Sequence, residues 1–379
     1  MSIAESATQA AADRAIDLKE LSSLAVEGLA PMFDPETSLF CYRMNNVGGS
    51  LKREGLSHRY TMMTLLGLHE FEKTGQRLPF NVVQILESLT KNLDWVTNIG
   101  DLGVLLWTHS VLTPDRAPAW LGDMDIEHAL DRYPDAREHR TMELAWFVTG
   151  LAHNLLTSRP ASPHFKDLAL DAYNKLEKNQ GSGGFFGHVG HRTTLSGMLR
   201  GSIGSFADQV YPIYGMARLA QACGFEEALT RAVDCAQGIC RVQGSLGQWW
   251  WHYDSGRGQV ARKYPVYSVH QHGMAPMALF AVGEASGKDF SGPIYKGLQW
   301  IAGQNELGTD LRDQMGKIIW RCILPQRQAE MYLDEVFGRL RVPSHLHPAG
   351  PLRVLHECRP YELGWLLYAF APRLPGASL

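Results

Sequence analysis

The segment ICRVQGSLGQWWWHYD, residues 239–254, leads from a helical pattern through a glutamine- and glycine-containing turn into three consecutive tryptophans. One face of a helix or strand cannot bury three neighbouring indoles, because successive side chains point in different directions. The segments LEKNQGSGGFFGH and LQWIAGQNELGTD resemble it, so that Gln180, Gln243 and Gln304 recur at intervals of 63 and 61 residues. Each glutamine follows an amphipathic helical pattern. A fixed period with one helix pair per unit is typical of repeat architectures.

Two kinds of helical pattern alternate along the chain, six of each. The amphipathic patterns, which have one polar face, lie near 12–29, 80–94, 124–135, 165–180, 226–242 and 291–303. The patterns that are apolar nearly all round lie at 60–71, 98–112, 141–156, 205–220, 268–282 and 359–371. A helix without a polar face must be surrounded by protein. The alternation predicts an all-α fold with six inner and six outer helices in a closed double ring, and a single domain over 1–379. An irregular bundle or a solenoid is the alternative.

The alternation and the Q-x-x-x-G-x-W/F-like turns resemble the (α/α)6 toroids. That superfamily includes terpenoid cyclases, prenyltransferase β chains, lanthionine cyclases, glycoside hydrolases, sugar epimerases and polysaccharide lyases. The resemblance extends over nearly the whole chain, but it concerns architecture. It implies the fold and leaves the function open.

Composition limits the partners. The 379 residues carry a net charge of −3 and show no basic stripe, so no nucleic-acid partner is expected. We find neither a secretory pattern at the N-terminus nor an apolar stretch near the roughly 20 residues that span a bilayer, which predicts a cytoplasmic protein without a membrane span. The six cysteines form no CxxC pair, so we expect reduced thiols, no metal site and no cofactor. The oligomeric state is left open.

The long connections predict where a ligand binds. Those at 31–56, 180–203, 243–265 and 304–357 all precede an apolar helix, so they emerge on one face of the ring. Long loops in compact domains are usually functional. The same face gathers the positive ends of six helix dipoles, which favour an anionic or hydroxyl-rich ligand. We therefore expect a pocket at the N-terminal ends of the inner helices.

Ionisable and aromatic side chains cluster at these helix starts and supply the candidate site. The candidate catalytic residues are Glu143, Asp208, His270, His272 and Glu357. The candidate substrate-binding residues are Arg59, Tyr60, Tyr211, Trp249, Trp250, Trp251, Tyr253, Arg359 and Trp365. Structural roles remain open for several of them: Asp208 could cap its helix, Glu143 could support a helix start, and Arg359 could pair with Glu362. His270 and His272 could hold a metal only in extended backbone, since on a helix they point apart. At least one of the three indoles is expected to face the pocket.

These residues favour a carbohydrate-active enzyme that acts on a small-molecule or oligosaccharide substrate. Hydrolysis would use two carboxylates, whereas lysis or epimerisation would use a His or Tyr base with an Arg to neutralise the developing charge. A terpenoid cyclase or prenyltransferase-like enzyme is the alternative. It is disfavoured because GDMDIEH, at 122–128, is only a partial match to the DxDD motif and no DDxxD-like string occurs. A non-catalytic glycan-binding toroid is a third possibility.

Overall fold

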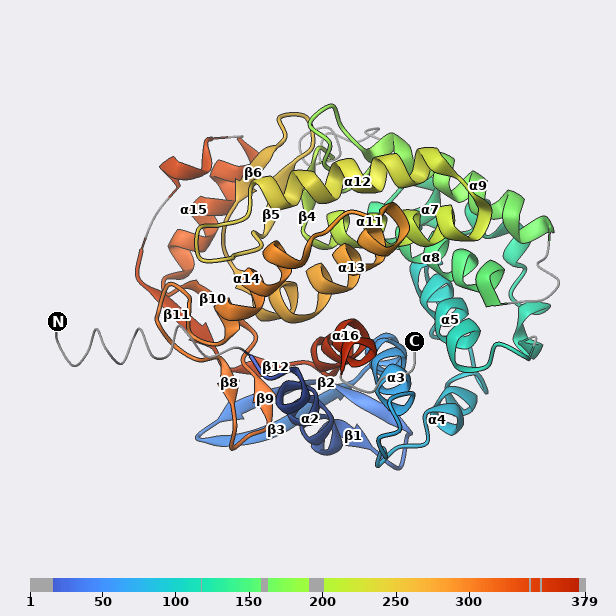
Figure 1. The fold of residues 1–379 in the computed structure, drawn as a ribbon, viewed down its shortest axis with the longest axis horizontal. Coiled ribbons are helices and arrows are strands. Elements are labelled where there is room, and N and C mark those ends of the chain that lie inside the picture. The colour runs from blue at the N-terminus through green and yellow to red at the C-terminus, as the bar shows by residue number, and fades with distance from the viewer. Residues whose placement is uncertain are drawn as a thin grey trace.

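The computed structural model describes residues 16–116, 118–157, 163–190, 201–340, 342–347 and 350–374. Six helices form its inner ring. They are α3 (His58–Glu72), α5 (Ile99–Leu112), α8 (Thr141–Thr157), α11 (Ala207–Cys223), α13 (Ala275–Ser286) and α16 (Pro360–Phe370). Each packs against the next, and α16 packs back against α3, so the ring is closed (Figure 1). The prediction of a closed array of apolar helices is confirmed.

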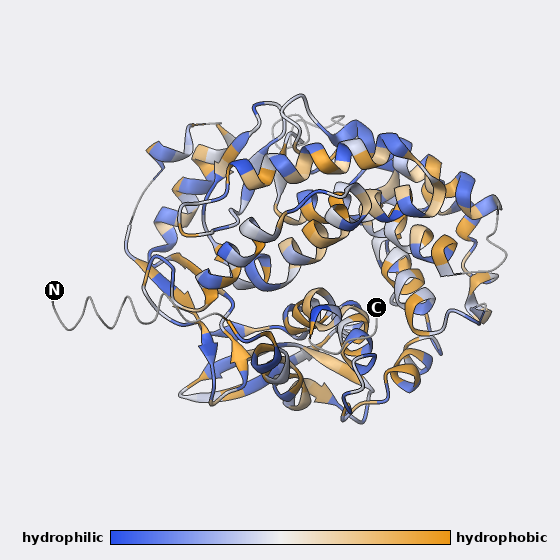
Figure 2. Ribbon diagram, in the orientation of Figure 1, coloured by the Kyte–Doolittle hydropathy of each residue, from blue (hydrophilic) through white to orange (hydrophobic). Residues whose placement is uncertain are grey.

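The outer helices cover this ring. They are α2 (Leu18–Leu29), α4 (Val82–Leu89), α9 (Pro163–Leu176), α12 (Glu226–Arg241) and α14 (Ser291–Ile301). Hydrophobic and hydrophilic residues alternate along α12 in Figure 2, as its amphipathic pattern requires. Among the described residues, no helix has the length and apolar character needed to cross a membrane.

The outer helix predicted near 124–135 is wrong as one continuous element. It consists of three short pieces: η3 (Ile126–His128), α6 (Ala129–Arg132) and α7 (Pro134–Arg137). Asp125 takes a left-handed conformation with φ of 45°, and Tyr133 is extended because it precedes Pro134. The proline starts a new helix at its first position, where its missing N–H costs nothing.

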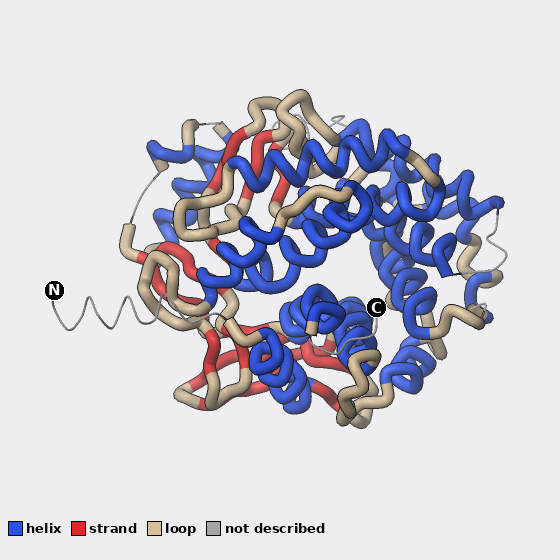
Figure 3. The backbone as a smooth tube through the Cα atoms, in the orientation of Figure 1, coloured by secondary structure: helices blue, strands red, loops and turns tan. Residues whose placement is uncertain are grey.

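The long connections contain short strands, which the all-α prediction did not include (Figure 3). β1 (Phe33–Asp34), β2 (Leu39–Val47), β3 (Ser50–Leu56) and β12 (Glu357–Cys358) form one sheet. Another combines β4 (Ile203–Ser205), β5 (His252–Asp254) and β6 (Gln259–Arg262), and a third combines β7 (Val266–Tyr267), β10 (Cys322–Pro325) and β11 (Leu352–Leu355). β8 (Arg312–Asp313) pairs with β9 (Ile318–Ile319), and α15 (Gln328–Arg339) lies in the same long connection as β8, β9, β10 and β11. These sheets order the face of the ring on which the inner helices begin.

The repeated glutamines fasten the outer ring. Gln180, after α9, donates from Nε2 to the carbonyl four residues on, at 2.9 Å, and to the carbonyl of Arg231 in α12, at 3.1 Å. Gln243, after α12, donates in the same way to the carbonyl four residues on, at 3.0 Å, and to Pro293 in α14, at 2.9 Å. Gln180 and Gln243 therefore each close their own turn and join it to the following outer helix.

A second pair of glutamines holds the inner ring against the same turns. Gln209 in the first turn of α11 accepts from the backbone N–H of Phe186 at 2.8 Å and donates to its carbonyl at 2.9 Å. Gln271, in the π-helical turn η5 (His270–Met274) before α13, accepts from the backbone N–H of Trp249 at 3.3 Å. Phe186 and Trp249 are both completely buried. Trp249 therefore occupies a structural position of the repeat, which explains the first of the three tryptophans.

Candidate active site

A cavity of about 210 Å³ opens where the inner helices begin. Its lining comes from α3, α8, α11, η5 and α16 and from the connections that precede them. The lining residues are Arg59, Tyr60, Met63, Met142, Trp146, Ala207, Tyr211, Trp251, Tyr267, Val269, His270, Met274, Arg321 and Tyr361. The predicted position of a pocket at the N-terminal ends of the inner helices therefore coincides with a real cavity.

Aromatic rings form much of the cavity wall. The ring of Trp251 lies 6.0 Å from that of His270 with 15° between their planes, and 4.9 Å from that of Tyr267. Trp146 meets Tyr211 edge to face at 5.1 Å. Aromatic faces in such a wall can stack on the apolar face of a planar or ring-shaped ligand.

Two arginines bring positive charge to the cavity. Arg59 donates from Nε to Asp101 at 2.6 Å, and its guanidinium lies 5.2 Å from the centroid of Trp146. Arg321 pairs with Glu362, and its guanidinium lies 4.9 Å from the centroid of Tyr267. A guanidinium has five N–H donors in a planar fork, so each arginine has more donors than these ion pairs use. A carboxylate in the cavity could bind to them.

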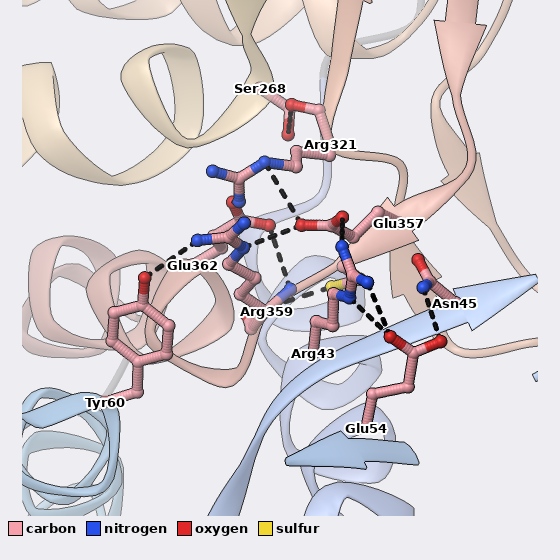
Figure 4. A network of polar contacts seen from close by, with 10 residues as sticks. Arg43, Asn45, Glu54, Tyr60, Ser268, Arg321, Glu357, Arg359 and Glu362 are labelled. Carbon is pink, nitrogen blue, oxygen red and sulfur yellow. Dashed lines mark hydrogen bonds and ion pairs between the residues drawn. The ribbon is translucent and has the colours of Figure 1, made fainter. Parts of the chain in front are cut away.

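A network of alternating charges holds Arg321 in place (Figure 4). Glu357 in β12 binds three arginines: Arg43 at 3.1 Å, Arg359 at 2.7 Å and Arg321 at 3.4 Å. Arg43 also pairs with Glu54 in β3 at 2.6 Å. The carboxylate of Glu357 is engaged by three arginines, so its position differs from that expected of a catalytic carboxylate.

The start of α16 joins this network. Glu362 accepts from the backbone N–H of Arg359 at 3.1 Å and so caps its own helix. The side chain of Arg359 instead donates to the hydroxyl of Tyr60 at 2.8 Å. Glu362 thus contacts Arg359 through its backbone N–H, whereas the Glu362 carboxylate pairs with the guanidinium of Arg321. Arg359 reaches the cavity only through Tyr60.

Glu143 and Asp208 lie close to each other, and each follows a residue that lines the cavity, Met142 and Ala207. Asp208 and His188 line a separate, smaller cavity of about 140 Å³. Asp208 accepts on Oδ2 from the backbone N–H of Ser205 at 2.8 Å, from its hydroxyl at 2.9 Å and from His188 at 3.2 Å. Burial raises the pKa of Glu143, and the negative charge of Asp208 raises it further. The hydrogen bond and charge of Asp208 raise the pKa of His188. Glu143 Oε2 and Asp208 Oδ1 are buried and have no hydrogen-bond partner within the part of the chain that the structure describes.

His270 and His272 lie in η5, a π-helical turn, so the extended backbone that a metal pair would need is not formed. Burial lowers the pKa of each imidazole to about 3. His270 lines the cavity, whereas His272 is completely buried and does not. Across the described ranges, no group of three or more His, Cys, Asp and Glu side chains could hold a metal ion.

No protein-family model matches the sequence, and a search of curated proteins gives no match. The structure is similar to a possible member of the GH105 family from Salmonella enterica, with a TM-score of 0.61 at 10% identity over 95% of each chain. It is also similar to a glycosyl hydrolase of family 88 from Bacteroides vulgatus (TM-score 0.59, 10% identity, 94% of this chain and 99% of that one). A third match is an unsaturated glucuronyl hydrolase specific for heparin (TM-score 0.57, 14% identity, 93% and 95%).

The chain has the (α/α)6 toroid fold. The fold prediction is therefore confirmed for nearly the whole chain. At these identities the similarity establishes the architecture of the toroid, while the chemistry has to be argued from its side chains.

Within the toroid, the three tryptophans take three different places. Trp249 is completely buried, and Trp250 packs in the turn, where its Nε1 donates to the carbonyl of Val242 at 2.9 Å. Only Trp251 lines the cavity. Tyr253 is buried and accepts from the backbone N–H of Trp250 at 3.1 Å. Trp249, Trp250 and Tyr253 thus support the connection rather than contact a ligand in the cavity.

Of the other predicted residues, four line the cavity and Trp365 lies behind its wall. Arg59, Tyr60, Tyr211 and His270 line the cavity. Trp365 is completely buried and donates to the hydroxyl of Tyr211 at 3.0 Å, so it positions a wall residue from behind.

Two residues of the site that can carry a positive charge, His188 and Arg321, were not predicted from the sequence. The wall residues Trp146, Tyr267 and Tyr361 were not predicted either. His188 follows Gln180 by eight residues, just as Trp251 follows Gln243, so the repeat contains a signal for it. Arg321 lies inside the long 304–357 connection, where no local pattern marks it. Its place depends on the pairing of β10 with β7 and β11.

Proposed function

We propose that this protein is a carbohydrate-active enzyme, a glycan hydrolase whose substrate carries a carboxylate on the sugar that enters the cavity. The observation that carries the proposal is the pair of Glu143 and Asp208, each with a buried oxygen that has no partner among the described residues. Each follows directly on a residue that lines the cavity with the aromatic walls and the two arginines. The similar solved structures, two of them named as or linked to glycosyl hydrolase families and one as a glucuronyl hydrolase, support the same class.

The cavity wall supports a sugar ligand. Trp251, Tyr267 and Trp146 offer flat apolar faces, and aromatic faces stack on the C–H faces of sugar rings. Tyrosine hydroxyls and His270 add hydrogen-bonding groups around the same space. A cavity that only encloses a hydrocarbon would not need two guanidinium groups, which are costly to bury without a purpose.

The arginines support an acidic sugar. Arg59 lies in the first turn of α3 and Arg321 in the connection just before β10, and each is held in place by an acidic partner and an aromatic ring. Because guanidinium groups match the planar geometry of carboxylates, a fixed arginine selects an anionic substituent. A uronate would satisfy both the stacking wall and these donors.

Glu143 and Asp208 divide the proton transfers between them. The raised pKa of Glu143 favours its protonated form, so it is the general acid that gives a proton to the leaving oxygen. Asp208 is the second carboxylate. It acts either as a general base that activates the attacking water or as a nucleophile that attacks the sugar itself. His188 holds Asp208 in position through Oδ2, which leaves Oδ1 for the reaction.

One observation favours a second chemistry. His270 is neutral, because burial lowers its pKa to about 3, and it lines the cavity together with Arg321 and Tyr267. A neutral imidazole beside a carboxylate-binding arginine could abstract the proton next to the carboxylate. That step would begin a lyase or epimerase reaction instead of hydrolysis.

The test incubates the purified full chain with short oligosaccharides that end in a saturated or unsaturated uronate, beside neutral counterparts of the same length. We expect cleavage of uronate substrates only, with products that together gain the mass of one water. The variant Glu143→Gln should lower kcat by roughly 100- to 10,000-fold. Glu138→Gln, an exposed glutamate before the same helix, is the matched control and should keep full activity.

Other products would overturn the hydrolase proposal in distinguishable ways. A cleaved product with a new double bond that absorbs ultraviolet light would indicate a lyase, and a product of unchanged mass would indicate an epimerase. In either case the loss should follow His270→Gln rather than Glu143→Gln. Binding of oligosaccharides without turnover would indicate a glycan-binding toroid. A thermal shift with prenyl diphosphates alone would favour the terpenoid class.

A further inference from the structure

A second cavity, of about 370 Å³, lies at the opposite end of the ring, where the inner helices finish. All six inner helices contribute to its lining. The lining includes His69 and Glu70 of α3 with Lys73 just after it, Val111 of α5, His153 and Thr157 of α8, Tyr214 and Arg218 of α11, Met277, Phe280, Ala281 and Glu284 of α13, Tyr368 and Ala369 of α16, and Pro372 and Arg373 just beyond. The volume falls within the roughly 300–1,000 Å³ range of small-molecule sites.

Stacked aromatic rings separate this cavity from the candidate active site. Trp107 lies between Trp365 and Tyr214, with ring centroids 5.3 Å and 5.0 Å away. Trp365 in turn donates to Tyr211, which lines the first cavity. Because Trp107 and Trp365 are completely buried, the axis of the toroid is filled at this level. The two cavities are therefore separate sites.

The floor of the second cavity is a hydrogen-bonded chain. His153 Nε2 lies 2.9 Å from the hydroxyl of Tyr214, which lies 2.5 Å from the hydroxyl of Tyr368. Burial raises the pKa of both phenols and lowers the pKa of His153, so all three groups are neutral. Phe280, Met277 and Val111 supply an apolar wall. The floor and wall together suit an organic molecule with polar and apolar parts.

The charges of the lining leave one cation in excess. Lys73 pairs with Glu70 at 3.1 Å. Glu284 pairs with both Arg218, at 3.2 Å, and Arg373, at 2.6 Å, so one carboxylate serves two guanidinium groups. Arg218 also stacks on Tyr214, with its guanidinium 5.2 Å from the ring centroid. A single anionic group against Arg218 would balance the charges of the side chains, against the opposing negative partial charge of the helix C-terminal ends.

Two buried nitrogen atoms of the lining also favour a bound ligand. Arg218 Nε and His69 Nδ1 have no hydrogen-bond partner among the residues placed by the structure. A buried donor left unsatisfied costs about 1–3 kcal/mol, so such groups normally meet a partner. Arg373 has an evident structural role, because it donates to the carbonyl of Ala369 at 2.8 Å near the end of α16. Arg218 bonds only to side chains, which leaves its Nε available to a ligand.

We propose that the cavity at the C-terminal ends of the inner helices is a second ligand site, which binds a small organic molecule with a single carboxylate. The carboxylate lies against Arg218, and the rest of the molecule contacts the tyrosine hydroxyls and the Phe280 wall. This site goes beyond the proposed hydrolase reaction and does not depend on it.

Isothermal titration of the full chain tests the proposal, with glucuronate as the probe and glucose and inorganic phosphate as comparisons. Glucuronate should bind more tightly than either. Arg218→Gln should weaken the binding at this site at least tenfold, and Tyr368→Phe should weaken it less. Arg59→Gln, at the other end of the ring, is the matched control and should leave this binding unchanged. Any glucuronate bound in the first cavity appears as the component that Arg59→Gln removes.

A gain of affinity guards against a variant that fails to fold. Glu284→Gln releases Arg218 from its carboxylate, so glucuronate should bind more tightly to this variant. The proposal is overturned if Arg218→Gln keeps its melting temperature and its glucuronate binding, or if Glu284→Gln folds without a gain. Equal binding of glucose would exclude an anion site, and equal binding of phosphate would exclude selection of an organic carboxylate.

Discussion

Gly67 of α3 lies directly against the backbone of Gly364 of α16, so that a Cβ atom on Gly67 would stand 2.0 Å from the Gly364 carbonyl oxygen. Real Cβ atoms essentially never approach that closely. This contact joins the first inner helix to the last and therefore closes the ring. Two helices can come this near only where neither has a side chain.

Replacing Gly67 with alanine should therefore force α3 and α16 apart. We expect Gly67→Ala to lower the free energy of unfolding by about 1–3 kcal/mol, the usual cost of overpacking. Chemical denaturation measures this change. Gly122→Ala is the control, because Gly122 has helical angles and open space around its Cα. A Gly67→Ala variant as stable as Gly122→Ala would show that the ring closes without this contact.

The repeated glutamines make a second prediction about stability. Gln243→Ala removes two hydrogen bonds, one of which joins the turn after α12 to α14. At about 0.5–1.5 kcal/mol each, the loss should be about 1–3 kcal/mol. Gln180→Ala removes the two corresponding bonds and a third, which Gln180 accepts from Arg231 at 3.3 Å, so its loss should be at least as large. Urea denaturation measures both, with the exposed Gln84→Ala as the control. Stability equal to that of the control would mean that the repeat has no clamping role.

The sequence predicts the helices well because their information is local. The twelve periodic patterns show which faces of the helices are buried. A long apolar pattern can therefore be recognised from the sequence alone. The strands could not be predicted, since they have two to nine residues and several of them pair with distant segments. Asn45 in β2, for example, lies opposite Glu357 in β12. The sequence around Asn45 and around Glu357 gives no sign that these two strands pair.

The candidate site shows the same difference between what local sequence predicts and what depends on distant segments. Arg59, Tyr211 and His270 could be predicted as site residues because they lie at the starts of apolar helices. Those starts meet at one cavity. The position of Glu357 could not be predicted, because it depends on Arg43, in the distant 31–56 connection, and on Arg321, much earlier in its own 304–357 connection. A buried carboxylate at a helix start looks the same in sequence whether it faces a ligand or three arginines.

The pair of His188 and Asp208 predicts a pH-dependent contribution to stability. The pKa of His188 is raised in the folded state by its hydrogen bond to Asp208. Its stabilising effect is therefore complete below the ordinary histidine value of about 6.5 and is lost as the pH rises through the raised folded value. The difference in unfolding free energy between the wild type and His188→Gln should be largest near about pH 6 and shrink above neutrality. Guanidinium denaturation across this range measures it. A difference that grows with pH would show that the pair is not charged. His345→Gln, at an exposed histidine outside this pair, is the control.

The three tryptophans predict two opposite phenotypes. Trp249 is completely buried in the repeat, so Trp249→Ala should lower the free energy of unfolding by about 3–5 kcal/mol. Trp251 lines the cavity, so Trp251→Ala should weaken binding of an acidic oligosaccharide while the melting temperature falls far less. Trp250 packs in the turn and should resemble Trp249 more than Trp251. Calorimetric titration and thermal melts on the three variants separate these effects. If Trp251→Ala loses stability as Trp249→Ala does and still binds the ligand, the cavity wall plays no part in recognition. The run would then be structural throughout.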